Sequence, residues 1–141
     1  MTPDAPPIEQ RHDLLLSSAD WQSRALILAE LQEMGYEVMA VPGVTYAINA
    51  VLKGLDDPPL LLIDVYHDPA ATPEKVRGLI SLLPGRPVIL LAGTFARERW
   101  RPLCREVARC FLRPIRIGDV IAAVQSLLPL AADGDGETPA N

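Results

Sequence analysis

The sequence predicts one α/β domain, a parallel sheet with helices on both of its faces. Between residues 11 and 130, short apolar runs alternate with segments of helical periodicity, and five such units can be counted. Nearly half of the 141 residues are apolar and 22% are charged, a balance typical of a folded globular protein. A chain of this length fits a single domain, so we expect no second one.

The first two units carry clear strand and helix signals. Residues 13–18 form an apolar run expected as the first strand, and a helix over residues 20–34 follows, with Gly35 placed to end it. Residues 36–41 alternate as a second strand does, and apolar residues recur at helical spacing over 44–55. An Asp-Asp-Pro-Pro cluster then breaks this second helix.

The third unit contains an acid inside its strand. Residues 60–65 are apolar throughout except for Asp64, as expected of a central strand buried on both faces. Thr72 offers an N-cap and Pro73 is favoured at the first helical position, so a third helix is expected from there to Leu83. The acid in the apolar strand needs a chemical explanation.

The fourth unit is less regular. Residues 88–92 are expected as the fourth strand, and the fourth helix lies within residues 96–108. Pro102 weakens this interpretation, because proline lacks an amide hydrogen and clashes with the preceding helical turn. The fourth helix is therefore expected to begin either near residue 96 or near Arg101.

The fifth unit and the two ends complete the domain. Residues 110–113 are expected as a short strand, and Asp119 is expected to cap a last helix that ends near Leu128. Residues 1–10 and 131–141 are rich in proline, glycine and small polar residues. We expect both ends to be flexible, the second as an acidic tail, around a domain of residues 11–130.

Composition and motifs exclude several classes of protein. No apolar run is long enough to span a membrane and no signal-peptide pattern begins the chain, so a cytoplasmic protein is expected. Neither GxGxxG nor GxxxxGK occurs, which argues against dinucleotide and nucleoside-triphosphate chemistry. Cys104 and Cys110 have no further cysteines to complete a metal site, and we expect them to be free, buried thiols.

Charge is distributed unevenly along the chain. The net charge is −5, yet residues 97–116 hold seven arginines against two glutamates. A solvated basic helix is one interpretation, and a face for an acidic protein is the other. Nucleic acid is the less favoured partner, because the chain as a whole is acidic and no recognition motif accompanies the arginines.

One edge of the predicted sheet collects polar residues. In an open parallel sheet, ligands bind at the carboxyl ends of the strands. A carboxylate such as Asp64 at the end of an apolar strand is usually kept for a metal, a phosphoryl group or a helix cap. With His67 and Asp68 it could also form a transition-metal site, whereas His12 has no evident partner. The residues expected at these strand ends are Ser18, Asp64, Ala92 and Arg113.

Three stretches of the sequence carry a resemblance to a known family. LLLIDVYHDP, PVILLAGT and FLRPI, in this order, resemble strands three, four and five of response-regulator receiver domains, over about residues 13–128. The resemblance implies a three-layer, flavodoxin-like (receiver-like) domain with a five-stranded parallel sheet in the order 2-1-3-4-5 and about five helices. It also implies a part in two-component, phosphorelay signal transduction.

The resemblance assigns the phosphoacceptor to Asp64, but the residues that hold Mg²⁺ in the family are replaced in this chain. In the family, the strand-three aspartate accepts a phosphoryl group, and Mg²⁺ is held by this aspartate and by an acidic pair after strand one. Asp64 matches the phosphoacceptor, but the acidic pair aligns with Ser18 and Ala19. Only Asp20 remains as a substitute ligand, so Mg²⁺ is expected only if Asp64 is phosphorylated.

Other family positions are also changed. Ala92 aligns with the Thr or Ser that contacts the phosphoryl group, and Thr94 would replace it only in a longer strand. Arg113 stands for the lysine before a proline whose peptide bond is cis in the family. Cys110 aligns with the signalling aromatic of strand five. These losses indicate a degenerate form, a pseudo-receiver.

Three functional hypotheses follow from the resemblance. The leading one is a pseudo-receiver without enzymatic activity that binds a histidine kinase, another signalling protein or a second copy of itself. The second is a working receiver that a histidine kinase phosphorylates at Asp64. The third is a small-molecule sensor whose ligand fills the space beside Ala19, Ala92 and Gly93. The partner face, on the fourth helix, fifth strand and last helix, is expected to include Arg97, Arg99, Arg101, Arg105, Arg109 and Cys110.

Overall fold

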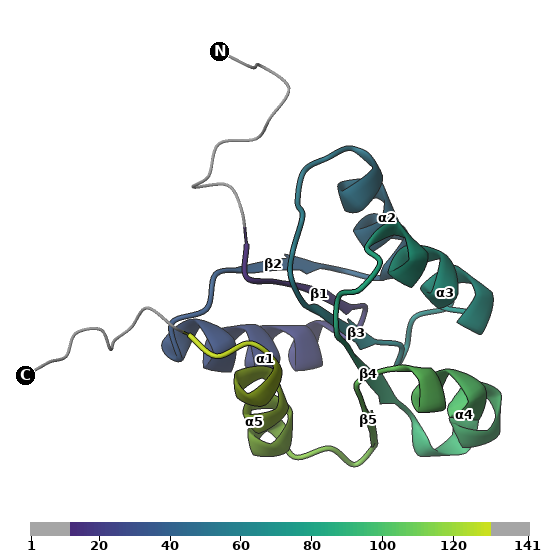
Figure 1. Ribbon diagram of the computed structural model, residues 1–141. Helices are drawn as coiled ribbons and strands as arrows, with labels where there is room; N and C mark the ends of the chain where they lie inside the picture. Colours follow the sequence, from purple (N-terminus) through teal and green to yellow (C-terminus); the bar gives the residue numbers. More distant parts are fainter. Residues whose placement is uncertain (1–11, 131–141) are drawn as a thin grey trace, which may run out of the picture.

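The computed structural model describes residues 12–130 of the chain. Within these residues five strands and five α-helices alternate, and a short 3₁₀ helix, Thr94–Ala96, precedes the fourth α-helix (Figure 1). The ends expected to be flexible, residues 1–10 and 131–141, lie outside the described residues. No helix in the described part of the chain has both the length and the apolar composition needed to cross a membrane.

The five strands form one parallel sheet in the order β2-β1-β3-β4-β5, which confirms the expected topology. Every residue of β1, β3 and β4 is buried, whereas the edge strands β2 and β5 are mostly half-buried. Central strands covered on both faces need apolar side chains throughout, which explains their continuous apolar runs. The strands are β1 (Leu14–Ser18), β2 (Val38–Val41), β3 (Leu61–Asp64), β4 (Val88–Ala92) and β5 (Arg109–Leu112).

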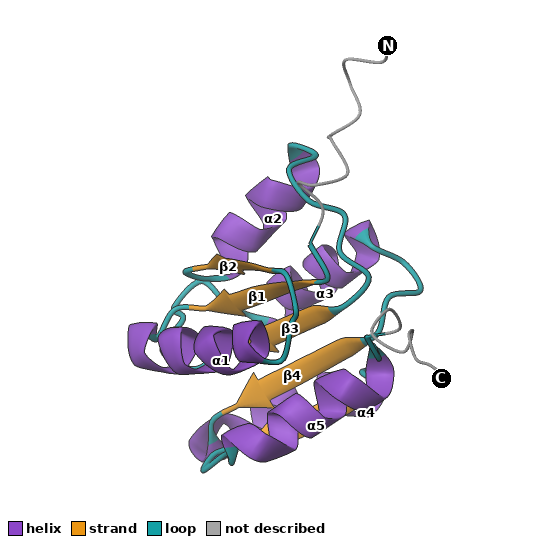
Figure 2. Ribbon diagram, turned by 90° about the vertical axis from the view of Figure 1, so that its left-hand side faces the viewer, coloured by secondary structure: helices purple, strands orange, loops and turns teal. Residues whose placement is uncertain are grey.

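Helices cover both faces of the sheet and create two apolar cores (Figures 1 and 2). Leu61 and Ile63 of β3 face α2, α3 and α4, while Leu62, between them, faces α1 and α5. This alternation follows from the two-residue period of a strand. The helices are α1 (Trp21–Glu33), α2 (Val44–Leu52), α3 (Pro73–Leu82), α4 (Arg97–Glu106) and α5 (Ile117–Leu127).

Local sequence fixes the start of two helices at the carboxyl edge of the sheet. The Asp20 carboxylate accepts a hydrogen bond of 3.0 Å from the Ser23 backbone N–H and caps α1. The Thr72 hydroxyl accepts one of 3.1 Å from the Lys75 backbone N–H, and Pro73 is the first residue of α3. The expected start of the third helix is therefore confirmed.

The fourth helix does not begin near Arg101. It starts at Arg97 and contains Pro102 in its interior, so that alternative is wrong. Trp100 and Leu103 on its inner face are 2% and 1% exposed, and both belong to the core beneath α4. Burial of these two side chains compensates for the hydrogen bond that proline removes.

Two further details of the C-terminal half differ from expectation. Asp119 does not cap α5: the N-cap residue is Arg116, without a side-chain capping bond, and Asp119 lies in the first turn. The fifth strand begins one residue earlier than expected, at Arg109. The remaining strand and helix boundaries fall within three residues of the expected ones, and β4 matches them.

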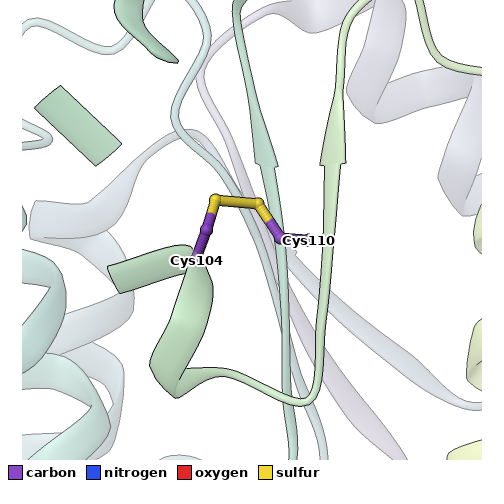
Figure 3. The surroundings of a disulfide bond; sticks show 2 residues. All are labelled: Cys104 and Cys110. Carbon is purple, nitrogen blue, oxygen red and sulfur yellow. A yellow bond between two sulfur atoms is a disulfide. The ribbon is translucent and has the colours of Figure 1, made fainter. Parts of the chain in front are cut away.

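The two cysteines are joined rather than free. Cys104, in the last turn of α4, and Cys110, in β5, form a disulfide (Figure 3). The expectation of two buried free thiols is therefore wrong. Cysteine count and spacing did not reveal the bond, because it depends on the way the chain turns back from α4 into β5.

Candidate functional site

The strand ends meet at one edge of the sheet, as the sequence predicts. Ser18 is the last residue of β1 and pairs in register with Asp64, the last residue of β3. Ala92 ends β4, and Arg113 follows β5 directly. Because the strand order reverses between β1 and β3, Asp64 lies at the position where open parallel sheets bind ligands.

The Asp64 carboxylate is closed off from solvent. Its side chain is 0% exposed, and both of its oxygen atoms accept hydrogen bonds. Oδ2 accepts from Ser18 Oγ and from Arg113 Nη2, each at 2.9 Å, and Oδ1 accepts from the Tyr66 backbone N–H at 3.1 Å. These three donors satisfy a buried acid that would otherwise be costly to bury.

Arg113 is positioned by the end of the sheet and by an aromatic ring. Its backbone N–H donates to Ala92 O at 2.9 Å, and the Arg113–Pro114 peptide bond is cis, as expected. The guanidinium carbon lies 4.1 Å from the centroid of the Tyr66 ring, and Nη2 also donates to Ser23 Oγ at 3.2 Å. Arg113 thereby covers the carboxylate from the side of β5.

Burial and charge act in opposite directions on Asp64. Removal from water raises the pKa of Asp64 above its usual value, because burial disfavours the charged carboxylate. The charge of Arg113 and the hydrogen bonds from Tyr66, Ser18 and Arg113 lower the pKa and offset only part of this effect. The site therefore holds a carboxylate that is harder to ionise than an exposed one.

Asp20, the expected substitute metal ligand, is used elsewhere. One oxygen caps α1, and Oδ1 lies 3.3 Å from His67 Nδ1. The pKa of Asp20 is lowered, chiefly by the backbone hydrogen bond from Ser23. In the described part of the chain, no group of three or more His, Cys, Asp or Glu side chains comes together. Both oxygen atoms of Asp20 and of Asp64 are already paired with protein groups, so the donor set does not fit the Mg²⁺ ion that the resemblance implies.

The alternative metal site of Asp64, His67 and Asp68 is not assembled either. Asp68 Oδ2 accepts from the Val44 backbone N–H at 2.8 Å, and Oδ1 accepts from the Ala70 N–H at 3.2 Å. Asp68 thus caps α2 from outside the helix. A side chain at Gly43 would place its Cβ 3.1 Å from that carboxylate, and Gly43 has a positive φ of 146°.

Ala92 and Thr94 leave Asp64 without a hydroxyl from strand four. β4 ends at Ala92, which is fully buried, so the longer strand that Thr94 would need is not formed. Thr94 instead begins the 3₁₀ helix, and its hydroxyl donates to the backbone oxygen of Arg113. The one hydroxyl on Asp64 among the described residues comes from Ser18, on the opposite side of β3.

A cavity of about 770 Å³ lies beside the covered carboxylate, between the segment after β3, the segment after β4, and Arg113. It is displaced toward α4 from the position expected from sequence. Gly93 contributes to it, but Ala19 and Ala92 do not. Its lining includes Tyr66, His67, Pro69, Arg99, Trp100 and Arg113.

The expected arginine face is divided in space. Arg97, Arg101 and Arg105 follow one another at four-residue spacing on α4 and are exposed, which puts them in one stripe. Arg99 instead lines the cavity, and Arg109 at the start of β5 donates to Ser126 Oγ of α5. Cys110 is half-buried and bonded to Cys104, so it contributes to the α4–β5 connection more than to an open surface.

Sequence reasoning missed one polar pair. His12, which has no evident partner in sequence, lies with Nδ1 3.1 Å from Asp56 Oδ1, and its backbone N–H donates to the same oxygen at 3.3 Å. The two residues are 44 positions apart and meet at the amino ends of β1 and β3, at the edge opposite to Asp64. No local signal connects them, because only the sheet brings them together.

We predict a specific pH dependence for Asp64→Asn. The native pKa of Asp64 is raised, so the folded chain binds more protons there than the unfolded chain above about pH 3.9, the usual aspartate value. The stability from this group is complete below that pH and is lost as pH rises through the native pKa. The free energy of unfolding of the wild type minus that of Asp64→Asn should therefore fall with rising pH.

Urea unfolding of both proteins between about pH 3 and 7 measures this difference, since the linear extrapolation gives each free energy of unfolding. Asp119→Asn, which changes an exposed aspartate, is the matched control for the loss of one carboxyl group. A difference that rises with pH would mean that the charge of Arg113 outweighs burial at Asp64.

Comparison with known proteins identifies the fold of the chain. No protein-family model and no curated protein sequence matches this chain. Among solved structures, the receiver domain of NtrX from Brucella abortus has a TM-score of 0.69 and 17% identity, over 84% of this chain and all of that one. A CheY-like receiver domain from Methanospirillum hungatei JF-1 has a TM-score of 0.71 and 18% identity, over 84% and 93%.

A third similar structure bears another name. Adenylate cyclase from Rhodopirellula baltica has a TM-score of 0.71 and 19% identity, over 84% of this chain and 87% of that one. At such identities the likeness concerns the arrangement of strands and helices, and not the chemistry of the site. The described residues have the fold of CheY-like response-regulator receiver domains.

Proposed function

We propose that this chain is a receiver-type signalling protein that works by binding another protein, without phosphorylation at Asp64 and without enzymatic activity. The observation that carries the proposal is the closure of Asp64, whose oxygen atoms accept bonds from Ser18, Tyr66 and Arg113. The fold supports a role in two-component signalling, which we place in the cytoplasm. The closed carboxylate supports the pseudo-receiver form of that role.

Phosphoryl transfer to an aspartate has requirements that this site meets poorly. The attacking carboxylate oxygen must approach the phosphorus in line with the leaving group, and cations must offset the charge that develops. Here the carboxylate is 0% exposed, and the Arg113 guanidinium occupies the approach from β5. Burial also raises the pKa of Asp64, which makes this carboxyl group harder to ionise than an exposed one.

A phosphodonor experiment tests this closure. The wild-type chain is incubated with acetyl phosphate and Mg²⁺, and its intact mass is followed. In parallel, beryllofluoride and Mg²⁺ are added during NMR observation of the amides near Asp64. We expect no mass gain of one phosphoryl group and no amide shifts that Asp64→Asn abolishes, because the carboxylate is already paired.

A receiver domain that phosphorylates itself under the same conditions is the positive control. Asp119→Asn, an exposed aspartate in the first turn of α5, is the matched variant for nonspecific acyl phosphorylation. A gain in mass that persists in Asp119→Asn and disappears in Asp64→Asn would establish the working phosphoacceptor instead.

The surface that supports partner binding is the exposed stripe of α4. Of the five arginines expected on the partner face, Arg101 alone forms an ion pair among the described residues, with Glu98 at 2.7 Å. Glu106, the other acid of α4, pairs with Arg77 of α3 at 3.1 Å. The stripe therefore keeps an excess of positive charge, which favours an acidic protein surface and disfavours face-to-face pairing of two copies.

We predict that Arg101→Glu with Arg105→Glu weakens partner binding by about tenfold or more, because both charges in the middle of the stripe are reversed. The partner is first identified by cross-linking in cells, and dissociation constants are then measured with purified proteins. Asp64→Asn should bind as the wild type does. A large loss of binding in Asp64→Asn, with the arginine variant unaffected, would reject the proposal.

Lys53→Glu with Lys75→Glu is the matched control for that experiment. Both lysines are exposed, at the end of α2 and in the first turn of α3, and the pair changes the net charge by the same amount. Sedimentation velocity of the wild type and of the arginine variant tests the homodimer. A dimer that the charge reversal dissociates would make the partner a second copy of this chain.

The cavity beside Arg113 supports a second candidate, a small-molecule sensor. Its aromatic lining from Tyr66, together with Arg99 and Arg113, suits a planar anion such as an aromatic carboxylate. A thermal-shift screen of such compounds should give a rise in melting temperature that Arg99→Ala reduces. A screen without any such compound would leave the cavity without a role as a sensor.

A further inference from the structure

The disulfide connects the exposed arginine helix to the edge of the sheet. Cys104 lies in the last turn of α4 and Cys110 in β5, with a sequence separation of six (Figure 3). Their Cα atoms are 5.4 Å apart, within the range that disulfides bridge without backbone movement. The bond thus joins two of the three elements on which the partner face was expected.

Apart from this bond, α4 is held by two buried side chains and by the ion pair of Glu106 with Arg77 of α3. Trp100 and Leu103 are its only buried residues, and Pro102 removes one hydrogen bond from its interior. The N-cap residue Ala96 makes no side-chain capping bond. A ten-residue helix has little stability of its own in water, so its anchoring determines whether it stays formed.

The two cysteines are only partly covered. Cys104 and Cys110 are both half-buried, and β5 is an edge strand of the sheet that the described residues form. Partial exposure admits a reagent, as at exchanging rather than fully buried, inert cysteines.

We propose that Cys104 and Cys110 form a site of reversible thiol–disulfide exchange that controls how firmly α4 is held against β5. The exchange partner is a low-molecular-weight thiol of the glutathione class, together with its disulfide. In the cytoplasm, where the proposed function places this chain, disulfides in proteins are usually transient and serve exchange or sensing. The exchange site rests on the proposed function only for its effect, which is a change in how α4 presents the arginine stripe to a partner.

The exchange balances as two displacements. The thiolate of one reagent molecule attacks a sulfur of the Cys104–Cys110 bond, which breaks to give a mixed disulfide and one cysteine thiolate. A second reagent thiolate displaces the remaining cysteine and leaves as the reagent's disulfide. Two electrons pass to the protein, both cysteine thiolates take up protons, and the reverse sequence oxidises them again.

Reduction has a local consequence because of where the bond lies. It releases the last turn of α4, which carries Arg105 and follows directly on Arg101 and Pro102. Pro102, which lies directly before this turn, donates no backbone hydrogen bond to the helix. The dithiol form therefore loses order in α4 first, while β1 and β3, buried in the centre of the sheet, keep theirs.

The test uses the full chain and needs no partner. Wild-type protein is equilibrated at a series of reduced-to-oxidised glutathione ratios, alkylated and weighed to give the fraction of the bond that is formed. Hydrogen exchange is then measured on both forms. We expect both forms to be populated within the series and exchange over residues 101–108 to be at least about tenfold faster in the reduced form, with β1 and β3 unchanged.

Two variants serve as controls for the hydrogen-exchange experiment. Cys104→Ser with Cys110→Ser should exchange as the reduced wild type does at every glutathione ratio. Ser126→Ala, which removes the hydroxyl beside Arg109 and leaves the bond intact, should still respond to glutathione. Addition of oxidised glutathione to the reduced wild type should restore slow exchange.

Three results would overturn the proposal: a bond that no glutathione ratio reduces, cysteines that no ratio pairs, or equal exchange over residues 101–108 in both forms. Failure of the proposed function is a separate outcome. If α4 loosens on reduction and the arginine variant binds its partner normally, the exchange site stands and the partner face is wrong.

Discussion

The pairing of the Asp64 carboxylate with Arg113, Ser18 and the Tyr66 backbone organises the carboxyl edge of the sheet. An acid with no exposed surface, at the end of an apolar central strand, is tolerated only if its oxygen atoms are satisfied. The donors come from the end of β1, from the segment after β3 and from the residue after β5. Removing one partner of such a buried pair typically costs about 3–5 kcal/mol. The three strand ends are therefore held together through one side chain.

Two other aspartates at this edge also have structural roles. Asp20 caps α1, and Asp68 caps α2 by accepting from the Val44 backbone N–H. These two carboxylates lie where a metal site would be expected. They are paired instead with helix N-termini, where the helix dipole favours negative charge. The carboxyl edge of the sheet therefore has polar side chains, as a ligand-binding edge does, but these side chains stabilise the fold. This arrangement underlies our proposal that the chain binds a partner and does not accept a phosphoryl group.

In contrast to the buried Asp64, the charged side chains of α4 are exposed. The helix places three arginines in an exposed stripe and buries little more than Trp100 and Leu103, so it is charged outside and lightly anchored inside. Its covalent connection through Cys104 and Cys110 supplies what its packing does not. The centre of the sheet, where every residue is buried, and this helix with two buried side chains lie in the same small domain.

The sequence by itself determined the features that depend on neighbouring residues. Apolar runs located the strands, with β4 placed to the residue, and Thr72 with Pro73 fixed the start of α3, because periodicity and capping are local. The apolar run before Asp64 also placed this residue at the ligand-binding edge, and the resemblance to receiver domains added the strand order. The same local reasoning misjudged Pro102, because the burial of α4 against the sheet was not visible in the sequence.

The tertiary structure decided everything that joins distant residues. The capture of Asp64 by Arg113, the pairing of His12 with Asp56, the bond between the cysteines and the position of the cavity all arise where separate elements meet. Side-chain partners across a sheet leave no periodic trace along the chain, so composition and spacing do not encode them individually. They follow only once the apolar faces have packed and have brought the strand ends together.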